Sequence, residues 1–517
     1  MEAESATYNE ENEASETWAN RPSYWLTRFV ILRLLGAIYA VAFLVAINQI
    51  LPLIGSNGLL PVGDFINNVS ASLGSKGAAF VRVPSLFWFW HSDTALLFVA
   101  WVGFLLSLIV MAGYANAIIL FLLWFFYLSL VHVGQDWYGY GWEIQLTETG
   151  FLAIFLCPLL DARPFPKRPP PYLIIVLFRW LIVRIMLGSG LIKWRGDESW
   201  RNGTALYYHF ETQPIPGPFS RWFHFLPRTV LKMGVWFNFL AELIAPLFSF
   251  YPRVARHIAG VVMILFQFNI ILSGNLSFLN WLTIVPALAC LDDGFWKVIL
   301  PHAIVRKAEA AAAVAEESKP MLVTSRIVAV MIAVLSVQPL VNLLSPQQIM
   351  NTSFDPLDLV NTYGAFGTVG QERFNVVFEG TSDNDSTDAA NWKPYLYKGL
   401  PVLPGKQPPQ IAPYHLRLDW QMWFASMSTP EEYPWTLHLV SQLLHNNAGA
   451  VSLFANNPFP GKPPRYVRAV LYHYRFAEPN NPQHLWWNRE RLGNWLPPFS
   501  ADDPRLLSFL QSEGWKP

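Results

Sequence analysis

The stretch YLIIVLFRWLIVRIMLGSGLI, residues 172–192, decides the fold. It is apolar along most of its length, and about 20 such residues suffice for a helix to cross the hydrocarbon core of a bilayer. The next segment, GLIKWRGDESWRNGTALYYHFETQPIPGPFS at residues 190–220, is instead rich in charged and aromatic residues. The first segment predicts a membrane-spanning helix. The second is an active site, a docking surface or an ordered connection.

Further apolar runs of similar length occur on both sides of this one. Together they predict an α-helical multi-pass membrane bundle of about nine spans over residues 27–344. The runs lie at residues 27–53, 95–112, 117–133, 144–160, 172–192, 231–251, 257–272, 276–291 and 323–344.

The composition agrees with a membrane protein. Charged residues make up 14% of the 517 residues and hydrophobic residues 53%, whereas roughly 25% of an average soluble chain is charged. Basic and acidic residues balance at 36 each, so no overall field would recruit a nucleic acid. We therefore expect membrane lipid as a partner and no nucleic acid.

Lys and Arg favour cytoplasmic loops, which sets the orientation of the bundle. With the N-terminus inside, alternate connections carry the basic residues Arg163, Lys167, Arg168, Arg253, Arg256, Lys297, Arg306, Lys307 and Lys319. This topology predicts a disordered acidic cytosolic tail at residues 1–26 and a cytosolic helical linker at residues 294–322. It places a structured loop at residues 193–230 and a C-terminal domain at residues 345–517 outside, together with N-x-S/T sequons at Asn68, Asn202, Asn275, Asn351 and Asn384.

The outer domain has strand-like periodicity. Hydrophobic and polar residues alternate in HLRLDWQMWF (residues 415–424) and VLYHYRF (residues 470–476), and FNVVFEG (residues 374–380) is a third expected strand. Residues 433–447 instead predict a helix after Pro434. We expect a mainly-β or α+β domain with Trp420 and Tyr472 in its core, and an exposed aromatic patch that includes Trp486 and Trp487.

Ionisable residues inside the predicted spans are candidate functional groups, because unpaired charges are costly in lipid. Arg184 and Glu242 lie at similar depth, so we expect an intramembrane ion pair between them, with a proton or substrate path as the alternative. Glu143 and Glu148 diverge by about 140° on a helix, so joint acid–base work is not expected of them. The chain has no GxGxxG, Walker, HExxH or GxSxG motif. Neither a metal nor a cofactor is expected.

The loop at residues 190–220 contains the residue types that an enzyme would need. Lys193, Asp197 and His209, with Glu148 of the fourth span, are the candidate catalytic residues of an enzyme near this loop. Their spacing fixes no geometry. We therefore predict an ordered re-entry loop, held by its charged residues Arg195, Asp197, Arg201, His209 and Glu211, and name no catalytic residue for the preferred interpretation.

Several long blocks of the chain resemble the lipase maturation factor family, in the order that the family has them. The blocks are HVGQDWYGYGWEIQLTETGFLAIFLCPL, RWLIVRIMLGSGLIKWRGDESWRNGTALYYHFETQPIPGP, SGNLSFLNWLTIVPALACLDD, VNTYGAFGTVGQERFNVVFEGT, YHLRLDWQMWFAS and NNPFPGKPPRYVRAVLYHYRF. The resemblance covers nearly the whole chain.

The resemblance implies a multi-pass protein of the endoplasmic reticulum membrane whose C-terminal domain is lumenal. It implies a chaperone-like maturation factor that assists folding and assembly of secreted dimeric lipases. The alternative is a membrane enzyme that modifies a lipid or a protein segment near residues 190–220, since the family is distantly similar to the membrane part of vitamin K-dependent carboxylases. Cys157 and Cys290 lie in predicted spans, unlike the lumenal cysteines of vertebrate members, so a redox role is not expected. In a bacterium the same topology would put the domain in the periplasm.

Overall fold

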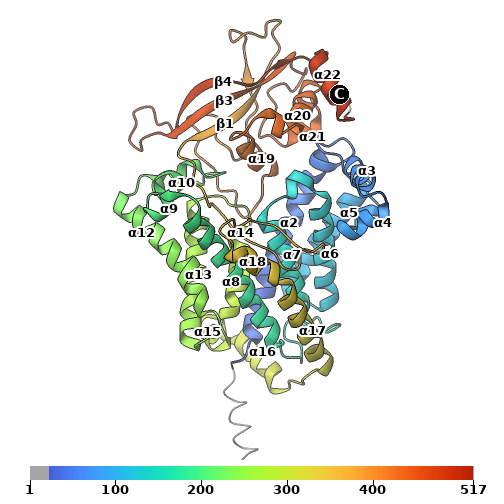
Figure 1. Cartoon of the computed structure of the whole chain (residues 1–517), viewed down its shortest axis with the longest axis vertical. Coiled ribbons are helices and arrows are strands. Elements are labelled where there is room, and N and C mark those ends of the chain that lie inside the picture. The colour runs from blue at the N-terminus through green and yellow to red at the C-terminus, as the bar shows by residue number, and fades with distance from the viewer. Residues whose placement is uncertain (1–21, 516–517) are drawn as a thin grey trace, which may run out of the picture.

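The computed structural model describes residues 22–515. Figure 1 shows a helical bundle with a domain containing a small sheet stacked on one end. The predicted acidic tail falls almost wholly outside the described residues, and the first helix among those residues, α2, begins at Trp25.

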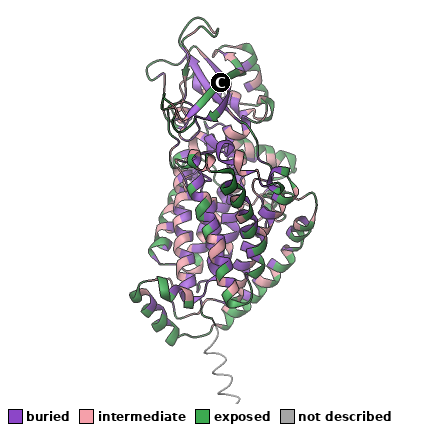
Figure 2. Ribbon diagram, turned by 90° about the vertical axis from the view of Figure 1, so that its left-hand side faces the viewer, coloured by how far each residue is buried: buried purple, intermediate pink, exposed green. Residues whose placement is uncertain are grey.

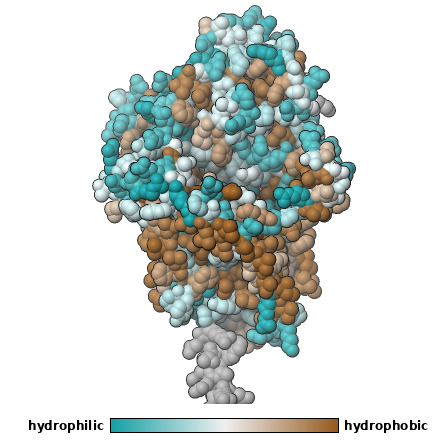
Figure 3. Space-filling model, in the orientation of Figure 1, coloured by the Kyte–Doolittle hydropathy of each residue, from teal (hydrophilic) through white to brown (hydrophobic). Residues whose placement is uncertain are grey.

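Within residues 22–515, six helical segments are long and apolar enough to cross a membrane. They are α2 (Trp25–Ile54), α5 (Asp93–Ala112), α8 (Tyr172–Arg195), the continuous segment Arg228–Phe248, α13 (Arg253–Ser273) and the continuous segment Lys319–Leu344. The segment Arg228–Phe248 contains α12 (Arg228–Phe239), a π-helical turn at Leu240–Ile244 and a 3₁₀ turn at Ala245–Phe248. The last segment joins α17 (Lys319–Leu335) to α18 (Val337–Leu344). Figure 3 shows the apolar belt that these helices present.

The expected count of about nine spans is not confirmed. Three of the predicted runs form shorter helices, namely α6 (Ala117–Val133), α7 (Gly141–Ile154) and α14 (Leu279–Ala287) with a 3₁₀ turn to Cys290. Helices α7 and α14 are buried along most of their length and pack against each other and against α8. Because neighbouring helices cover them, their ends can stop short of the bilayer surfaces.

Short helices mark the two ends of the bundle. At the end that carries the sheet lie α3 (Val62–Ser72), α4 (Lys76–Arg82), α9 (Glu198–Arg201), α10 (Leu206–Thr212) and α11 (Ser220–His224). At the opposite end lie α15 (Asp293–Ile299) and α16 (His302–Ala313). There Asp292 accepts hydrogen bonds from Arg253 and Arg256, so part of the basic charge at that end is fixed in ion pairs.

The C-terminal domain is built on an antiparallel sheet with the strand order β2-β1-β3-β4. The strands are β1 (Arg373–Thr381), β2 (Lys393–Pro394), β3 (Tyr466–Phe476) and β4 (Trp487–Phe499). Its helices are α19 (Arg417–Ala425), α20 (Trp435–Leu444), α21 (Ala448–Ser452) and α22 (Pro504–Ser512). The strands predicted at residues 374–380 and 470–476 are present as β1 and β3, which pair with Phe378 opposite Ala469. Figure 2 shows that residues of this sheet are buried, as is the interior of the bundle.

The strand predicted at residues 415–424 is wrong, because Arg417–Ala425 forms helix α19. The helix lies at the junction, where it contacts both β1 and the turn Gln135–Tyr138 of the bundle. Its polar residues do not face solvent. Asp419 accepts from the backbone N–H groups of Gly399 and Leu400, and Gln421 donates to the carbonyl oxygen of Asp136. The alternation of hydrophobic and polar residues therefore reflects buried polar contacts and not a strand with one solvent-exposed face.

The predicted core residues Trp420 and Tyr472 are buried. The predicted aromatic patch is wrong for Trp487, which is fully buried against Phe476 with 4.2 Å between ring centroids. Trp486 is half-buried beneath Arg221, whose guanidinium carbon lies 3.9 Å from the ring centroid. These aromatic rings stabilise the contact between the sheet and the loop at residues 193–230.

Candidate functional site

The segment between α18 and β1 runs back along α8, and two glycines make room for it. An added Cβ at Gly188 would lie 2.3 Å from the carbonyl oxygen of Tyr363, and one at Gly196 would lie 2.4 Å from that of Gly367. Real Cβ atoms do not approach oxygen so closely. The GSGLIKWRG sequence at the end of α8 therefore permits backbone from the C-terminal part to lie directly on a membrane helix.

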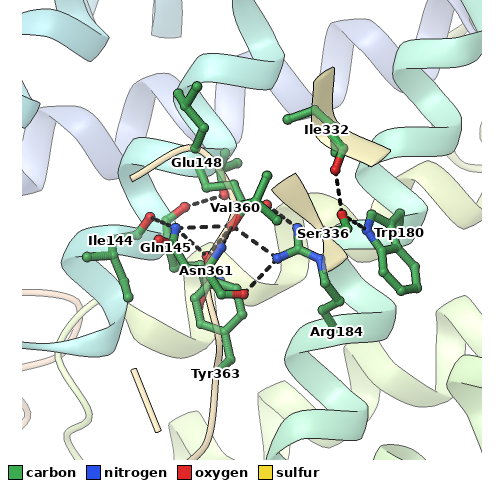
Figure 4. A network of polar contacts seen from close by, with 12 residues as sticks. Ile144, Gln145, Glu148, Trp180, Arg184, Ile332, Ser336, Val360, Asn361 and Tyr363 are labelled. Carbon is green, nitrogen blue, oxygen red and sulfur yellow. Dashed lines mark hydrogen bonds and ion pairs between the residues drawn. The ribbon is translucent and has the colours of Figure 1, made fainter. Parts of the chain in front are cut away.

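A buried polar network joins this segment to α7 and α8 (Figure 4). Glu148 forms an ion pair with Arg184, and it also accepts from Tyr363 at 2.7 Å and from the side chain of Asn361 at 3.1 Å. Arg184 in turn donates to the carbonyl oxygen of Asn361 at 2.8 Å. The predicted pairing of Arg184 with Glu242 is therefore wrong. Depth in the membrane does not distinguish Glu148 from Glu242, because these residues belong to two different elements that contact α8 on different sides.

Glu242 pairs instead with Lys193, one of the candidate catalytic residues. The ammonium lies 2.5 Å from the carboxylate, which also accepts from Asn238 at 2.8 Å. Both charged side chains are 5% exposed. The pair connects the outer end of α8 to the π-helical turn Leu240–Ile244.

A second buried ion pair ties the sheet domain to the bundle. Arg417 of α19 lies 2.9 Å from Glu143 of α7, and both side chains are fully buried. Arg417 also donates to the carbonyl oxygen of Trp137 and covers the ring of Tyr138 at 3.4 Å from its centroid. Tyr127 donates to Glu143. Glu143 and Glu148 thus belong to two separate docking contacts.

The loop at residues 193–230 is ordered, with its charged side chains largely bound to backbone groups. Asp197 accepts from the N–H groups of Ser199 at 2.8 Å and Val369 at 3.1 Å. Arg195 and Arg201 donate to the carbonyl oxygens of Leu343 and Trp194. These bonds fit the predicted role of the loop as a structured connection.

The same loop holds the start of the sheet. Arg373 of β1 is buried and donates to the carbonyl oxygens of Glu211, Gln213 and Pro214, and burial lowers its pKa to about 9. The carboxylate of Glu211 accepts from the N–H of Phe476 at 2.6 Å.

A cavity of about 410 Å³ lies where the bundle, this loop and the sheet domain meet. Lys193 and His209 line it, whereas Asp197 and Glu148 do not. Burial, together with the nearby Lys193 charge, lowers the pKa of His209 to about 4, so its imidazole is neutral at neutral pH. The four candidate catalytic residues are thus not assembled at one place. Lys193 and His209 line the cavity, Asp197 caps α9, and Glu148 pairs with Arg184.

Sequence reasoning missed Asn361, Arg373 and Arg417 as contact residues between the two parts. VNTYG and GQERF carry Asn361 and Arg373 in blocks quoted above, but nothing local indicates their partners. Arg417 did have a signal. HLRLDWQMWF has no β-branched residue, and its Leu, Arg, Gln and Met favour helix.

Comparisons with known proteins agree on one family. The lipase maturation factor transmembrane domain matches residues 26–298, and the lipase maturation factor C-terminal domain matches residues 359–497. Lipase maturation factor 1 of Bos taurus is 43% identical over 95% of this chain and 92% of its own length, and that of Mus musculus is 44% identical over 95% and 90%. Lipase maturation factor 2 of Xenopus laevis is 29% identical over 95% and 85%. No solved structure matches the chain. Residues along almost its entire length therefore place this membrane protein in the lipase maturation factor family.

Proposed function

We propose that this protein is a membrane-anchored maturation factor that assists folding and assembly of secreted lipases. The observation that carries the proposal is the match with lipase maturation factor 1 over 95% of the chain at 42–44% identity, which includes both the bundle and the sheet domain. Because the match with these relatives includes both the bundle and the sheet domain, we infer that the two parts work together. The junction ion pairs support this, because they hold the sheet domain at a fixed height above the bundle.

The compartment in this proposal is the endoplasmic reticulum, with the sheet domain in the lumen and an odd number of crossings. Supporting this orientation, Lys297, Arg306 and Lys307 lie in α15 and α16 at the end opposite the sheet. Basic residues favour the cytoplasmic side of a membrane. Secreted lipases fold in the lumen, where a sheet domain at the other end would meet them.

We assign the client contact to the free edge of β4. This strand pairs with β3 alone among the described residues, and residues 488–492 along it are exposed. An edge strand offers backbone hydrogen bonds to an extended chain of almost any sequence. An incompletely folded lipase exposes such segments, and pairing with β4 would keep them from aggregating.

The test is secretion of an active lipase from cells that lack or contain this protein. A dimeric lipase should show higher activity per unit of secreted lipase protein when the full chain is present, with little change in its synthesis. Equal specific activity in both cells would refute the proposal.

A matched pair of variants tests the assigned surface. Leu492 on β4 is 50% exposed, and Leu73, which follows α3 of the bundle, is 43% exposed. Leu492→Lys places a charge on the edge and should lower lipase activity at unchanged abundance of this protein, whereas Leu73→Lys should leave it unchanged. Equal effects of the two substitutions would argue that β4 is not the contact.

The membrane-enzyme alternative keeps one supporting observation, which is that Lys193 and His209 share a cavity. The ammonium of Lys193 is held by Glu242, however, so it is not a free nucleophile or base. Intact-mass measurement of lipase made with and without this protein separates the two functions. A covalent mass difference would favour the enzyme, and identical masses with different activity would favour the maturation factor.

A further inference from the structure

The junction cavity extends along α8 from the sheet domain into the bundle. Its mouth is on the sheet side, where the exposed residues Glu372 and Met427 line it. Lys193 lies below this rim, and Met186 lies two turns further into the bundle, a depth of about 10 Å at the helical rise. Its deeper part is lined by the apolar side chains of Ile185, Met186 and Phe266, together with the amides of Gln145, Gln267 and Asn280.

Two buried polar side chains face the cavity without partners. The imidazole of His209 and the hydroxyl of Ser189 are 9% and 8% exposed, and neither donates or accepts a side-chain hydrogen bond within residues 22–515. Buried polar groups are normally paired, so such a pair indicates a ligand that supplies the missing bonds. The deeper amides differ, because Gln267 and Asn280 bond each other at 2.7 Å.

The charges around the cavity favour an uncharged ligand. The cation of Lys193 is neutralised by Glu242 at 2.5 Å. The other two charged residues on the lining, Glu372 and Arg373, have opposite signs, and the Arg373 guanidinium donates to three backbone carbonyl oxygens. His209 is neutral, so it offers one N–H donor and one nitrogen acceptor rather than a charge. These groups suit a hydroxyl, which can both donate and accept a hydrogen bond, or an ester, which can accept one.

We propose that this cavity binds one neutral, single-chain lipid, with its hydroxyl or ester head at His209 and Ser189 and its acyl chain along Met186 and Phe266. The volume of about 410 Å³ falls in the range of about 300–1,000 Å³ typical of small-molecule sites. A monoacylglycerol has the required chemistry. This site is additional to lipase maturation and does not depend on it.

A peptide segment of a client fits the cavity less well. Each buried peptide unit needs a donor and an acceptor, and the deep amides Gln145 and Gln267 already bond to Thr283 and Asn280. An acyl chain needs no such partners. Its burial is favourable by roughly 0.8 kcal/mol per methylene.

The experiment uses purified full-length protein in neutral detergent, without any lipase. The probe is a monoacylglycerol that carries a photoreactive diazirine near the end of its acyl chain, and cross-linked residues are mapped by mass spectrometry. We expect saturable labelling of the segments that contain Met186 and Phe266. Unlabelled monoacylglycerol should compete, whereas the corresponding fatty acid anion and lysophosphatidylcholine should compete at least about tenfold more weakly.

Three variants sharpen the test. Ser189→Phe fills the cavity and should abolish labelling, whereas Leu265→Phe adds the same ring to an exposed position of α13 and should not. His209→Phe keeps the ring packed on Phe366 but removes the hydrogen bond, so binding should weaken roughly two- to tenfold. This variant decides the matter if Ser189→Phe fails to fold.

Three outcomes would overturn the assignment. They are labelling confined to lipid-facing positions, labelling unchanged in both cavity variants, and stronger displacement by an apolar peptide than by monoacylglycerol. Equal competition by the fatty acid would refute the neutral head group. Because lipase is absent, none of these results bears on the maturation assay, and failure of that assay would leave the lipid site intact.

Discussion

Replacing Arg417 with methionine should severely destabilise the junction between bundle and sheet domain. Arg417 and Glu143 are both fully buried at 2.9 Å, so removal of the guanidinium leaves a buried carboxylate that faces only the hydroxyl of Tyr127 and, at 3.6 Å, the imidazole of His415 among the described residues. It also leaves the carbonyl oxygen of Trp137 without this donor. Breaking one side of a buried ion pair costs about 3–5 kcal/mol. Methionine fills much of the vacated volume, so the loss is mainly electrostatic.

The double variant Arg417→Met with Glu143→Gln removes both charges and should recover roughly half of that loss. Thermal unfolding of purified full-length protein, followed by size-exclusion chromatography, compares the wild type, both single variants and the double variant. Arg475→Met is the matched control, because Arg475 is 65% exposed and 3.6 Å from Glu372. Its effect should stay below about 1 kcal/mol. If the double variant loses as much as the two single variants added together, the ion-pair argument is wrong.

Gly188→Ala should destabilise the protein by about 1–3 kcal/mol, because the new methyl would meet the carbonyl oxygen of Tyr363. In the same thermal assay Gly63→Ala, which has open space, should be neutral or slightly stabilising. Acid should lower stability between pH 6.5 and 4, because His209 and His415 have folded pKa values of about 4 against 6.5 when free, so the unfolded chain takes up protons that the folded chain does not. Each imidazole contributes up to about 1.4 kcal/mol per pH unit. Asp419, with a pKa raised to about 6, acts in the opposite direction, because the folded chain binds its proton before the unfolded chain does. It offsets only one of the two histidines, so the His209→Phe and His415→Phe double variant should lose the acid sensitivity in pH-dependent melting. Asn275 is 1% exposed and bonds to the carbonyl oxygen of Pro409, so glycan mapping in a eukaryotic host should find it bare, while glycans on exposed Asn68, Asn202 or Asn384 would confirm that those segments are lumenal.

The elements that could be predicted from sequence are those whose environment is uniform along their length. The span at residues 172–192 and strand β3 each have one kind of surroundings, either lipid and helices or a packed sheet face. Helix α19 has two, with the sheet on one side and the bundle on the other. Its polar residues therefore contact buried protein groups and do not face water, so the two-residue period in the sequence does not indicate a strand there.

The site shows the same limit more sharply. The sequence gives depth for a charge in a span but not its direction around the helix, so Arg184 was assigned to Glu242 although Glu148 lies opposite it. The cavity could not be predicted, because its walls come from five or more segments that only the fold assembles. Of its residues, Lys193 and His209 were recognised as chemically capable.

The interlocking of the C-terminal segment with α7 has a consequence for synthesis. Glu148 is made 213 positions before Asn361, and Glu143 is made 274 positions before Arg417. At translation rates of about 5–20 residues per second, these carboxylates wait on the order of 10–60 s for their last partners. The membrane part cannot reach its final form before Asn361 and Arg417 have been made, so a product terminated ahead of them would be an unfinished bundle, exposed to quality control, rather than a stable membrane fragment.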